Sequence, residues 1–144
     1  MHPSPTVITL GVSDLPRARA FYCQGLGFGA SSSSNEHIVF LKTSGVVLAL
    51  YSRTALAEDA CLPVGSGGTG FGGITLARNL GSPAEVDAFL ERARQAGATI
   101  LKPAQQVFWG GYSGYFADLD GHPWEVAYNP HWQLGASGLV ELPD

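Results

Sequence analysis

The stretch GYFADLDGHPWEVAYNP, residues 114–130, decides how this chain is expected to fold. Two segments of alternating apolar and polar residues flank the sequence DLDG at 118–121. An Asp-Gly pair between such segments is a strong signal for a tight turn that joins antiparallel strands. The second segment carries a single carboxylate, Glu125, among apolar neighbours. The stretch therefore predicts a β-hairpin with one acidic side chain on its second strand.

The order of predicted elements occurs twice along the chain. The segments TVITLGVS and GGITLARN share Ile-Thr-Leu, at residues 8–10 and 74–76, and each leads into a capped helix. The first helix is predicted to run from residue 14 to about residue 24. The second is predicted from Ser82, with a capping box completed by Glu85, to its end at Gly97. With three predicted strands after each helix, the organisation is β-α-β-β-β twice.

The chain of 144 residues is predicted to form one domain with four parts. Module one covers about residues 6–52, a connector covers 53–70, module two covers about 71–129, and a C-terminal tail covers 130–144. The connector contains a short helical piece, TALAEDA, and then GSGGTG. No strand leads into this glycine-rich run and no Lys-Ser or Lys-Thr pair follows it, so it favours a flexible connector over a phosphate-binding loop.

Composition excludes several classes of protein. Hydrophobic residues make up 45%, charged residues 14%, and the net charge is -4, as in a soluble globular protein. With only 8 Lys plus Arg, the chain has no basic surface for nucleic acid. No run approaches the ~18 apolar residues of a membrane span, and the N-terminus does not resemble a signal peptide. We therefore expect a cytoplasmic protein, with Cys23 and Cys61 as free thiols.

Two segments carry a resemblance to a known family. With LGVSDLPRARAFYCQGLGF at 10–28 and GYFADLDGHPWEVAYNP at 114–130, the chain resembles the vicinal oxygen chelate superfamily, which includes glyoxalase I, extradiol dioxygenases and bleomycin resistance proteins. The resemblance covers about Val7 to Pro130. It implies an α+β fold in which two βαβββ modules form a curved, partly closed mixed sheet around a central cavity, with the helices outside. Leu119 replaces a proline that is frequent in the family, while Asp120-Gly121 preserves the turn.

The resemblance also implies where a metal would bind. Metal-dependent members contribute two inward side chains from each module, and these four places correspond here to Val7, Leu48, Gly73 and Glu125. Only Glu125 can donate to a metal, whereas Ni, Zn, Fe or Mn sites need three or four donors. We therefore expect no cofactor, with a divalent metal held by other residues as the alternative. Metal ligation is not expected of the four histidines, His2, His37, His122 and His131, which lie in predicted loops or near the chain ends.

Strand alternation predicts which side chains line the cavity. One face is expected to carry Val7, Thr9, Leu48, Leu50, Gly73, Thr75 and Glu125. The helix-facing side is expected to carry Ile8, Leu10, Val47, Ala49, Ile74, Leu76, Trp124 and Val126, together with Tyr51 and Tyr128. The first face is mainly apolar with one acid, a composition typical of small-molecule sites. A register error of one residue would exchange the two faces.

Within this cavity, Glu125 has three possible roles. It could act as a general base, pair with a cationic group on a ligand, or remain an ordinary surface charge. The aromatic side chains of residues 108–116 could stack on a flat ligand or simply pack in the core. The predicted ligand-binding residues are Glu125, Trp109, Tyr112, Tyr115, Thr9, Leu48, Leu50, Thr75 and Phe40, and Glu125 is the catalytic candidate.

The leading hypothesis is a small-molecule binding or sequestering protein, similar to the bleomycin resistance branch and without the family's metal site. The alternative is a glyoxalase-type lyase, isomerase or dioxygenase that uses Glu125 as base or metal ligand. A scaffold with a vestigial pocket is the third hypothesis. Because proteins of this fold usually form dimers, the resemblance also implies a homodimer.

Overall fold

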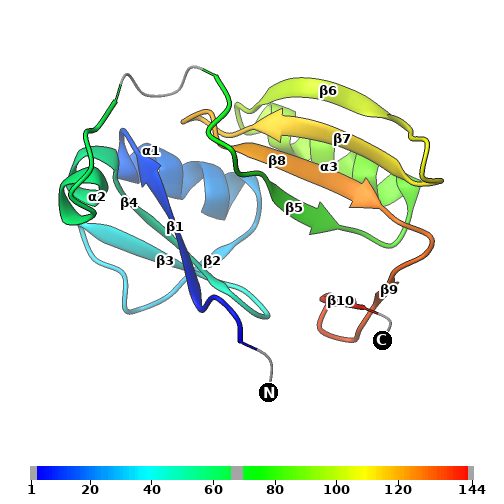
Figure 1. The fold of residues 1–144 in the computed structure, drawn as a ribbon, viewed down its shortest axis with the longest axis horizontal. Helices are drawn as coiled ribbons and strands as arrows, with labels where there is room; N and C mark the ends of the chain where they lie inside the picture. Colours follow the sequence, from blue (N-terminus) through cyan, green and yellow to red (C-terminus); the bar gives the residue numbers. More distant parts are fainter. Residues whose placement is uncertain (1–2, 66–69, 143–144) are drawn as a thin grey trace. The chain divides into compact units, whose positions relative to one another are not determined.

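The computed structural model describes residues 3–65 and 70–142. It is an α+β structure with two mixed four-stranded sheets, ordered β1-β4-β3-β2 and β5-β8-β7-β6 (Figure 1). The chain divides into two compact units, Met1–Thr69 and Gly70–Asp144, and each unit contains one of these sheets. Each unit follows the order β-α-β-β-β, so the predicted fold class and the repeat are confirmed.

The first unit begins with β1 (Val7–Val12) and α1 (Leu15–Ala20). The side chain of Asp14 caps α1 by accepting a hydrogen bond from the Arg17 backbone N–H at 3.0 Å. The helix then widens into a π-helical turn, η1 (Phe21–Gly25), where the Leu26 N–H donates to the Phe21 carbonyl at 2.9 Å. The predicted helix is thus present, but its last turn is wider than an α-helix.

The first sheet is completed by β2 (Gly29–Ala30), β3 (Ile38–Lys42) and β4 (Val47–Ser52). Strand β4 lies between β1, to which it is parallel, and β3, to which it is antiparallel. A short helix, α2 (Arg53–Asp59), follows β4 directly and is capped by Ser52, whose side chain accepts a hydrogen bond from the Ala55 N–H. The predicted helical piece in the connector is therefore present.

The register of β1 and β4 corrects the predicted faces of the first sheet. Leu48 is the partner of Ile8, and Leu50 is the partner of Leu10. Because partners in a ladder point to the same side, both leucines share the face of Ile8 and Leu10 rather than that of Thr9. This face is buried and lies toward α1, and its core side chains are Leu10, Val12, Val39, Leu41, Leu48 and Leu50.

The opposite face of the first sheet lies away from α1, and we call it the first open face. The register assigns to it Val7, Thr9, Gly11, Ile38, Phe40, Val47, Ala49 and Tyr51. Ala49 and Tyr51 were predicted to face the helices, and that prediction is wrong for the same reason as for Leu48 and Leu50. The run VVLALY is apolar throughout, so its composition does not show which side chains face the core.

The second unit contains β5 (Leu76–Asn79), α3 (Pro83–Gln95), β6 (Thr99–Gln106), β7 (Tyr112–Ala117) and β8 (Pro123–Tyr128). The backbone N–H of Glu85 donates to the Ser82 side chain at 3.2 Å, which confirms the predicted N-cap. Val86, Leu90 and Ala93 are buried on one side of α3, as their spacing predicts. Gly97, with φ +108°, follows the helix.

Helix α3 covers one face of the second sheet. The rings of Phe89 on α3 and Phe116 on β7 lie 6.3 Å apart, and Phe116 stacks on Trp124 of β8 at 6.0 Å. Val126 shares this face and is fully buried. The prediction that Trp124 and Val126 face the helix side is therefore confirmed.

Strand β5 is shorter than predicted. It begins at Leu76, so Gly73, Ile74 and Thr75 lie before the strand and are exposed. Gly73 has φ +90°, a conformation that strands do not use. The predictions that Gly73 and Thr75 line the sheet, and that Ile74 packs against the helices, are therefore wrong.

After β8 the chain forms a small separate hairpin of β9 (Gln133–Leu134) and β10 (Val140–Glu141). The predicted tail thus has structure of its own. Most of the glycine-rich run at 65–70, predicted to be a flexible connector, lies outside the described residues.

Candidate functional site

The candidate site is centred on Glu125 and Tyr115, which face each other across the hairpin of β7 and β8. Both side chains are half-buried, and as cross-strand partners they lie on the same face of the sheet. Burial raises the pKa of Tyr115 above its usual value, and the negative charge of Glu125 raises it further. Tyr115 therefore stays protonated at neutral pH and keeps a phenol O–H beside the carboxylate.

The turn between β7 and β8 fixes this pairing. Asp118 is buried, and its Oδ1 accepts hydrogen bonds from the backbone N–H groups of Asp120 at 2.9 Å and His122 at 2.8 Å. Gly121 adopts φ +83°, which a glycine allows without strain. Because the register of a hairpin is set by its turn, this local network determines that Tyr115 lies opposite Glu125.

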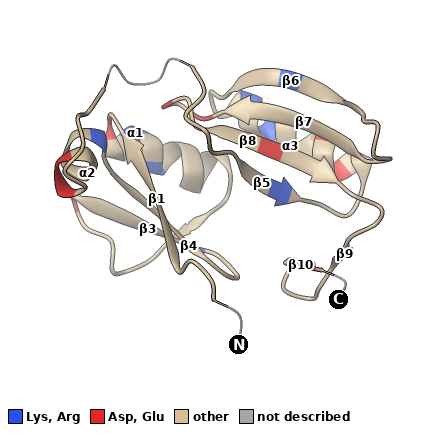
Figure 2. Ribbon diagram, in the orientation of Figure 1, with Lys and Arg blue, Asp and Glu red and all other residues tan. Residues whose placement is uncertain are grey.

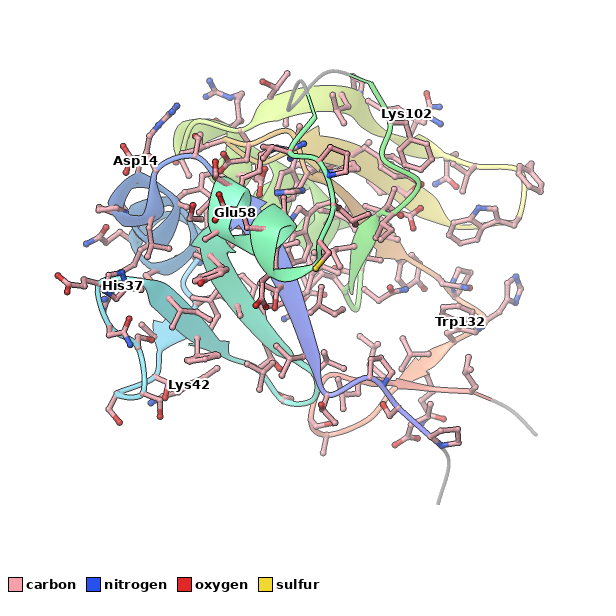
Figure 3. The ribbon with its side chains drawn as sticks, turned by 60° about the vertical axis from the view of Figure 1, so that its left-hand side comes forward. Asp14, His37, Lys42, Glu58, Lys102 and Trp132 are labelled. Atoms are coloured by element: carbon pink, nitrogen blue, oxygen red, sulfur yellow. The ribbon has the colours of Figure 1, made fainter. Side chains whose placement is uncertain are left out.

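Small side chains surround the pair on the face away from α3, which we call the second open face. The register gives Ala77 as the β5 neighbour of Glu125, while Ser113 pairs with Ala127 and Ala117 pairs with Pro123. The phenol and the carboxylate therefore stand above a floor of small residues. On the other side of Tyr115 its partner is Lys102 of β6, which is exposed and is labelled in Figure 3.

Tyr112 does not belong to this face. It pairs with Tyr128 on the helix side of the sheet, and its hydroxyl donates to Asp87 Oδ1 on α3 at 2.7 Å. Tyr112, one of the predicted ligand-binding residues, therefore lies on the opposite face of the sheet from Glu125, because β-strand alternation separates Tyr112 from Tyr115. The predicted helix-side position of Tyr128 is confirmed.

Trp109 lies in the turn between β6 and β7, at one end of the second open face. A Cβ added to Gly111 would overlap the six-membered ring of Trp109, so the ring occupies the space beside Gly111. Gly111 precedes Ser113 and Tyr115 in the alternation of β7, and it lies roughly 13 Å along the strand from Tyr115. Trp109 is therefore on the side of Glu125, although only a ligand of some length could reach both.

The remaining predicted site residues lie elsewhere. Thr9 and Phe40 are on the first open face, in the first unit. Leu48 and Leu50 are core residues of that unit, and Thr75 is exposed ahead of β5. Sequence reasoning missed Lys102, because the register shifts of β6 on either side of it cannot be read from the sequence.

Potential metal ligands near Glu125 are few in the described part of the chain. Within residues 3–65 and 70–142, no three His, Cys, Asp or Glu side chains come together in an arrangement that could hold a metal ion. Correcting the register of β4 does not change the set of donors, because Val47 and Ala49, which flank Leu48, also lack a donor atom. His37 lies in the loop before β3 with its side chain pointing outward (Figure 3), 3.4 Å from Glu36.

The repeated βαβββ order and the Glu125 hairpin agree with the comparison with protein families. The model of the Glyoxalase/Bleomycin resistance protein/Dioxygenase superfamily matches residues 5–126. The chain belongs to this superfamily. The search of curated proteins found no match.

Solved structures of the glyoxalase superfamily resemble the chain over most of its length. A glyoxalase-related enzyme from Fulvimarina pelagi is 39% identical, with 98% of this chain and 99% of that chain covered and a TM-score of 0.89. A glyoxalase/bleomycin resistance protein/dioxygenase from Nocardioides is 27% identical, with coverages of 94% and 91% and a TM-score of 0.74. A lactoylglutathione lyase from Agrobacterium tumefaciens, at 23% identity, coverages of 90% and 96% and a TM-score of 0.68, shares the fold.

Proposed function

We propose that this member of the glyoxalase superfamily binds a small molecule on the second open face, with Glu125 as the polar anchor. The observation that carries the proposal is the cross-strand pairing of Glu125 with Tyr115, with small side chains around the pair. A few polar groups fixed in position on a largely apolar surface are typical of small-molecule sites.

The chemistry of the pair indicates what the ligand must offer. An ionised carboxylate only accepts hydrogen bonds, and the phenol of the neighbouring Tyr115 can take one of its acceptor positions. The remaining positions favour a ligand with N–H donors or a positive charge. Because Tyr115 remains neutral, it adds no charge and keeps the carboxylate oriented.

The proposed role is binding or sequestration rather than metal-dependent catalysis. A catalytic metal needs three or four protein donors, and only Glu125 of the corresponding positions provides one. Metal analysis of the purified protein tests this point. About one equivalent of Ni, Zn, Fe or Mn per chain, with Glu125 among its ligands, would contradict the proposal.

A thermal-shift screen with small amines and other cations tests the anchor. Wild-type protein, Glu125→Gln, Tyr115→Phe and the control Glu91→Gln should be compared, since Glu91 is an exposed carboxylate on α3. We expect a stabilising ligand to lose its effect in Glu125→Gln, to bind more weakly to Tyr115→Phe, and to act normally on the control. Equal shifts in wild type and Glu125→Gln would remove Glu125 from the site.

A second candidate function is an enzyme of the lyase, isomerase or dioxygenase type. It is favoured by the 39% identity to the glyoxalase-related enzyme from Fulvimarina pelagi. In this case Glu125 would act as a general base, and Tyr115 would hold its carboxylate in position. An activity that disappears in Glu125→Gln while ligand binding persists would favour this candidate over sequestration.

We also propose that the protein is a cytoplasmic homodimer. Phe71 and Ile74 are 73% and 72% exposed, and apolar side chains this accessible favour a partner surface. Light scattering at micromolar concentration should report twice the mass of the chain, and a monomer would contradict the dimer. No helix in the described parts of the chain is long and apolar enough to cross a membrane.

A further inference from the structure

The first open face combines apolar side chains with two hydroxyl groups, those of Thr9 and Tyr51. Thr9, Ala49 and Phe40 form one row across β1, β4 and β3, and Gly11, Tyr51 and Ile38 form the next. Most of these side chains are half-buried. The face therefore offers flat apolar contacts and two hydroxyl groups, and its strands β1 and β4 contribute no charge.

Arg53 crosses this face. It follows β4 directly as the first residue of α2, and a Cβ at Gly11 would lie only 3.1–3.4 Å from its Cα, Cβ and Cγ atoms. The stem of Arg53 thus occupies the space above Gly11, in the row that also contains Tyr51. A glycine at position 11 is what permits this close approach.

The guanidinium of Arg53 has few hydrogen-bond partners among the described residues. Its Nε is buried and lacks a hydrogen-bond partner, the only such side-chain atom in the described parts of the chain. Its Nη2 donates a long bond of 3.5 Å to the Val64 carbonyl, and no carboxylate among the described residues forms an ion pair with it. A guanidinium stays charged at all physiological pH values, and burying an unpaired N–H group is unfavourable. A negatively charged ligand beside Arg53 would supply the missing hydrogen-bond acceptor.

We propose that the first open face binds a small organic anion through Arg53. The Nε and Nη2 groups of an arginine form a planar fork that matches two oxygens of a carboxylate or phosphate. An anion in this fork would replace the long bond to Val64 and give Nε its missing partner. Arg53 as a whole is half-buried but its Nε is buried, so the anion has to displace the Val64 contact to reach the fork. The apolar part of the ligand would lie on Phe40, Ala49 and Tyr51.

This site differs from the Glu125 site in unit and in charge. Arg53 and its floor belong to the first unit, whereas Glu125 and Tyr115 belong to the second. The first open face selects for an anion and the second for a cation or an N–H donor. The anion site therefore does not depend on the proposed function of Glu125.

Direct titration of the wild-type protein gives the first test. Sodium benzoate, phenyl phosphate and inorganic phosphate are titrated while the arginine Nε–H resonances are followed by NMR, with benzyl alcohol as the uncharged analogue. We expect benzoate and phenyl phosphate to shift the Arg53 signal, inorganic phosphate to act more weakly, and benzyl alcohol to leave it unchanged. An Arg53 signal that does not respond to either aromatic anion would overturn the proposal.

Variants give the second test, read by calorimetric titration with benzoate. Arg53→Met should weaken binding by about tenfold or more, and Arg53→Lys should give an intermediate affinity, because lysine keeps the charge without the fork. Arg19→Met, an exposed arginine on α1, and Glu125→Gln should bind as wild type does. Should Arg53→Met fail to fold, the lysine variant and the NMR titration still decide. Equal affinities in wild type and the Arg53 variants would contradict the site.

Discussion

The two sheets have the same order of elements but opposite chemistry on their open faces. Strands β1 and β4 of the first sheet carry no charged residue, whereas on the second open face β6 and β8 carry Lys102 and Glu125 (Figure 2). In both sheets the buried core side chains on the helix-facing side are apolar, such as Leu50 in the first sheet and Phe116 and Val126 in the second. The comparison teaches that a repeated fold is maintained by the covered faces, while the open faces are free to acquire separate functions.

The largest difference in stability is expected between a substitution on the covered face of β4 and one on its open face. Leu50 is fully buried on the covered face, and its neighbour Tyr51 lies on the open face. Leu50→Ala should lower the free energy of unfolding by about 2–5 kcal/mol, because it removes buried methyl groups and leaves a cavity. Tyr51→Phe should change it by at most about 0.5 kcal/mol. Urea unfolding measures both, and similar losses would show that the register of β4 is wrong.

A glycine in each sheet gives the next contrast. A Cβ at Gly114 in β7 would lie 2.7 Å from Leu90 Cδ1 and 2.8 Å from the Lys102 carbonyl oxygen, whereas a Cβ at Gly29 in β2 would meet only Lys42 Cδ at 3.8 Å. Gly114→Ala should therefore cost about 1–3 kcal/mol of unfolding free energy through overpacking. Gly29→Ala should be nearly neutral in the same assay. A neutral Gly114→Ala would mean that α3 and β6 pack more loosely than described.

The ionisation of the Tyr115 phenol with pH tests the pairing of Tyr115 and Glu125 on the second open face. Burial first, and then Glu125, raises the pKa of Tyr115 above the usual value of about 10. Neutral Tyr115 therefore stabilises the folded protein. This stabilisation is fully present below a pH of about 10, the usual pKa, and is lost as the pH rises through the higher pKa of the folded protein. Glu125→Gln removes the charge but not the burial, so the pKa should fall part of the way back. Ultraviolet absorbance of the tyrosinate, with Tyr115→Phe as the reference, measures the change, and identical titrations would exclude the pairing.

The smallest effect should separate the two neighbouring tyrosines of β7. Tyr112→Phe removes the hydrogen bond to Asp87 on the helix side, and because this bond is exposed the stability should fall only slightly. Ligand binding at Glu125 should not change. Tyr115→Phe should instead alter ligand binding. Thermal melts and ligand titration of both variants test this. A binding defect in Tyr112→Phe would contradict the assignment of Tyr112 to the helix side.

Most of the fold could be predicted because local signals agreed with one another. The N-cap at Ser82, the Asp-Gly turn at 120–121 and the spacing of Val86 and Leu90 each indicate one structure. Strand β4 could not be assigned to its faces, since an apolar run lacks the alternation that identifies a half-buried strand. The early start predicted for β5 failed because the repeat of Ile-Thr-Leu suggested a strand where Gly73 prevents one.

The candidate site was only partly predictable. Glu125 was identified as the one carboxylate of its strand, and Tyr115 could be paired with it by counting outward from the turn at Asp120-Gly121. The position of Arg53 could not be predicted, because its approach to Gly11 depends on how α2 follows β4 in three dimensions.

The turn anchored by Asp118 has a consequence for how the Glu125 site forms. Tyr115 and Glu125 are only ten residues apart along the chain, and the turn between them is held by its own hydrogen bonds. Closing such a short loop costs little entropy, and contacts of this kind can form early in folding. The carboxylate and its phenol thus come together by local chain closure, before any distant part of the polypeptide has to find its place.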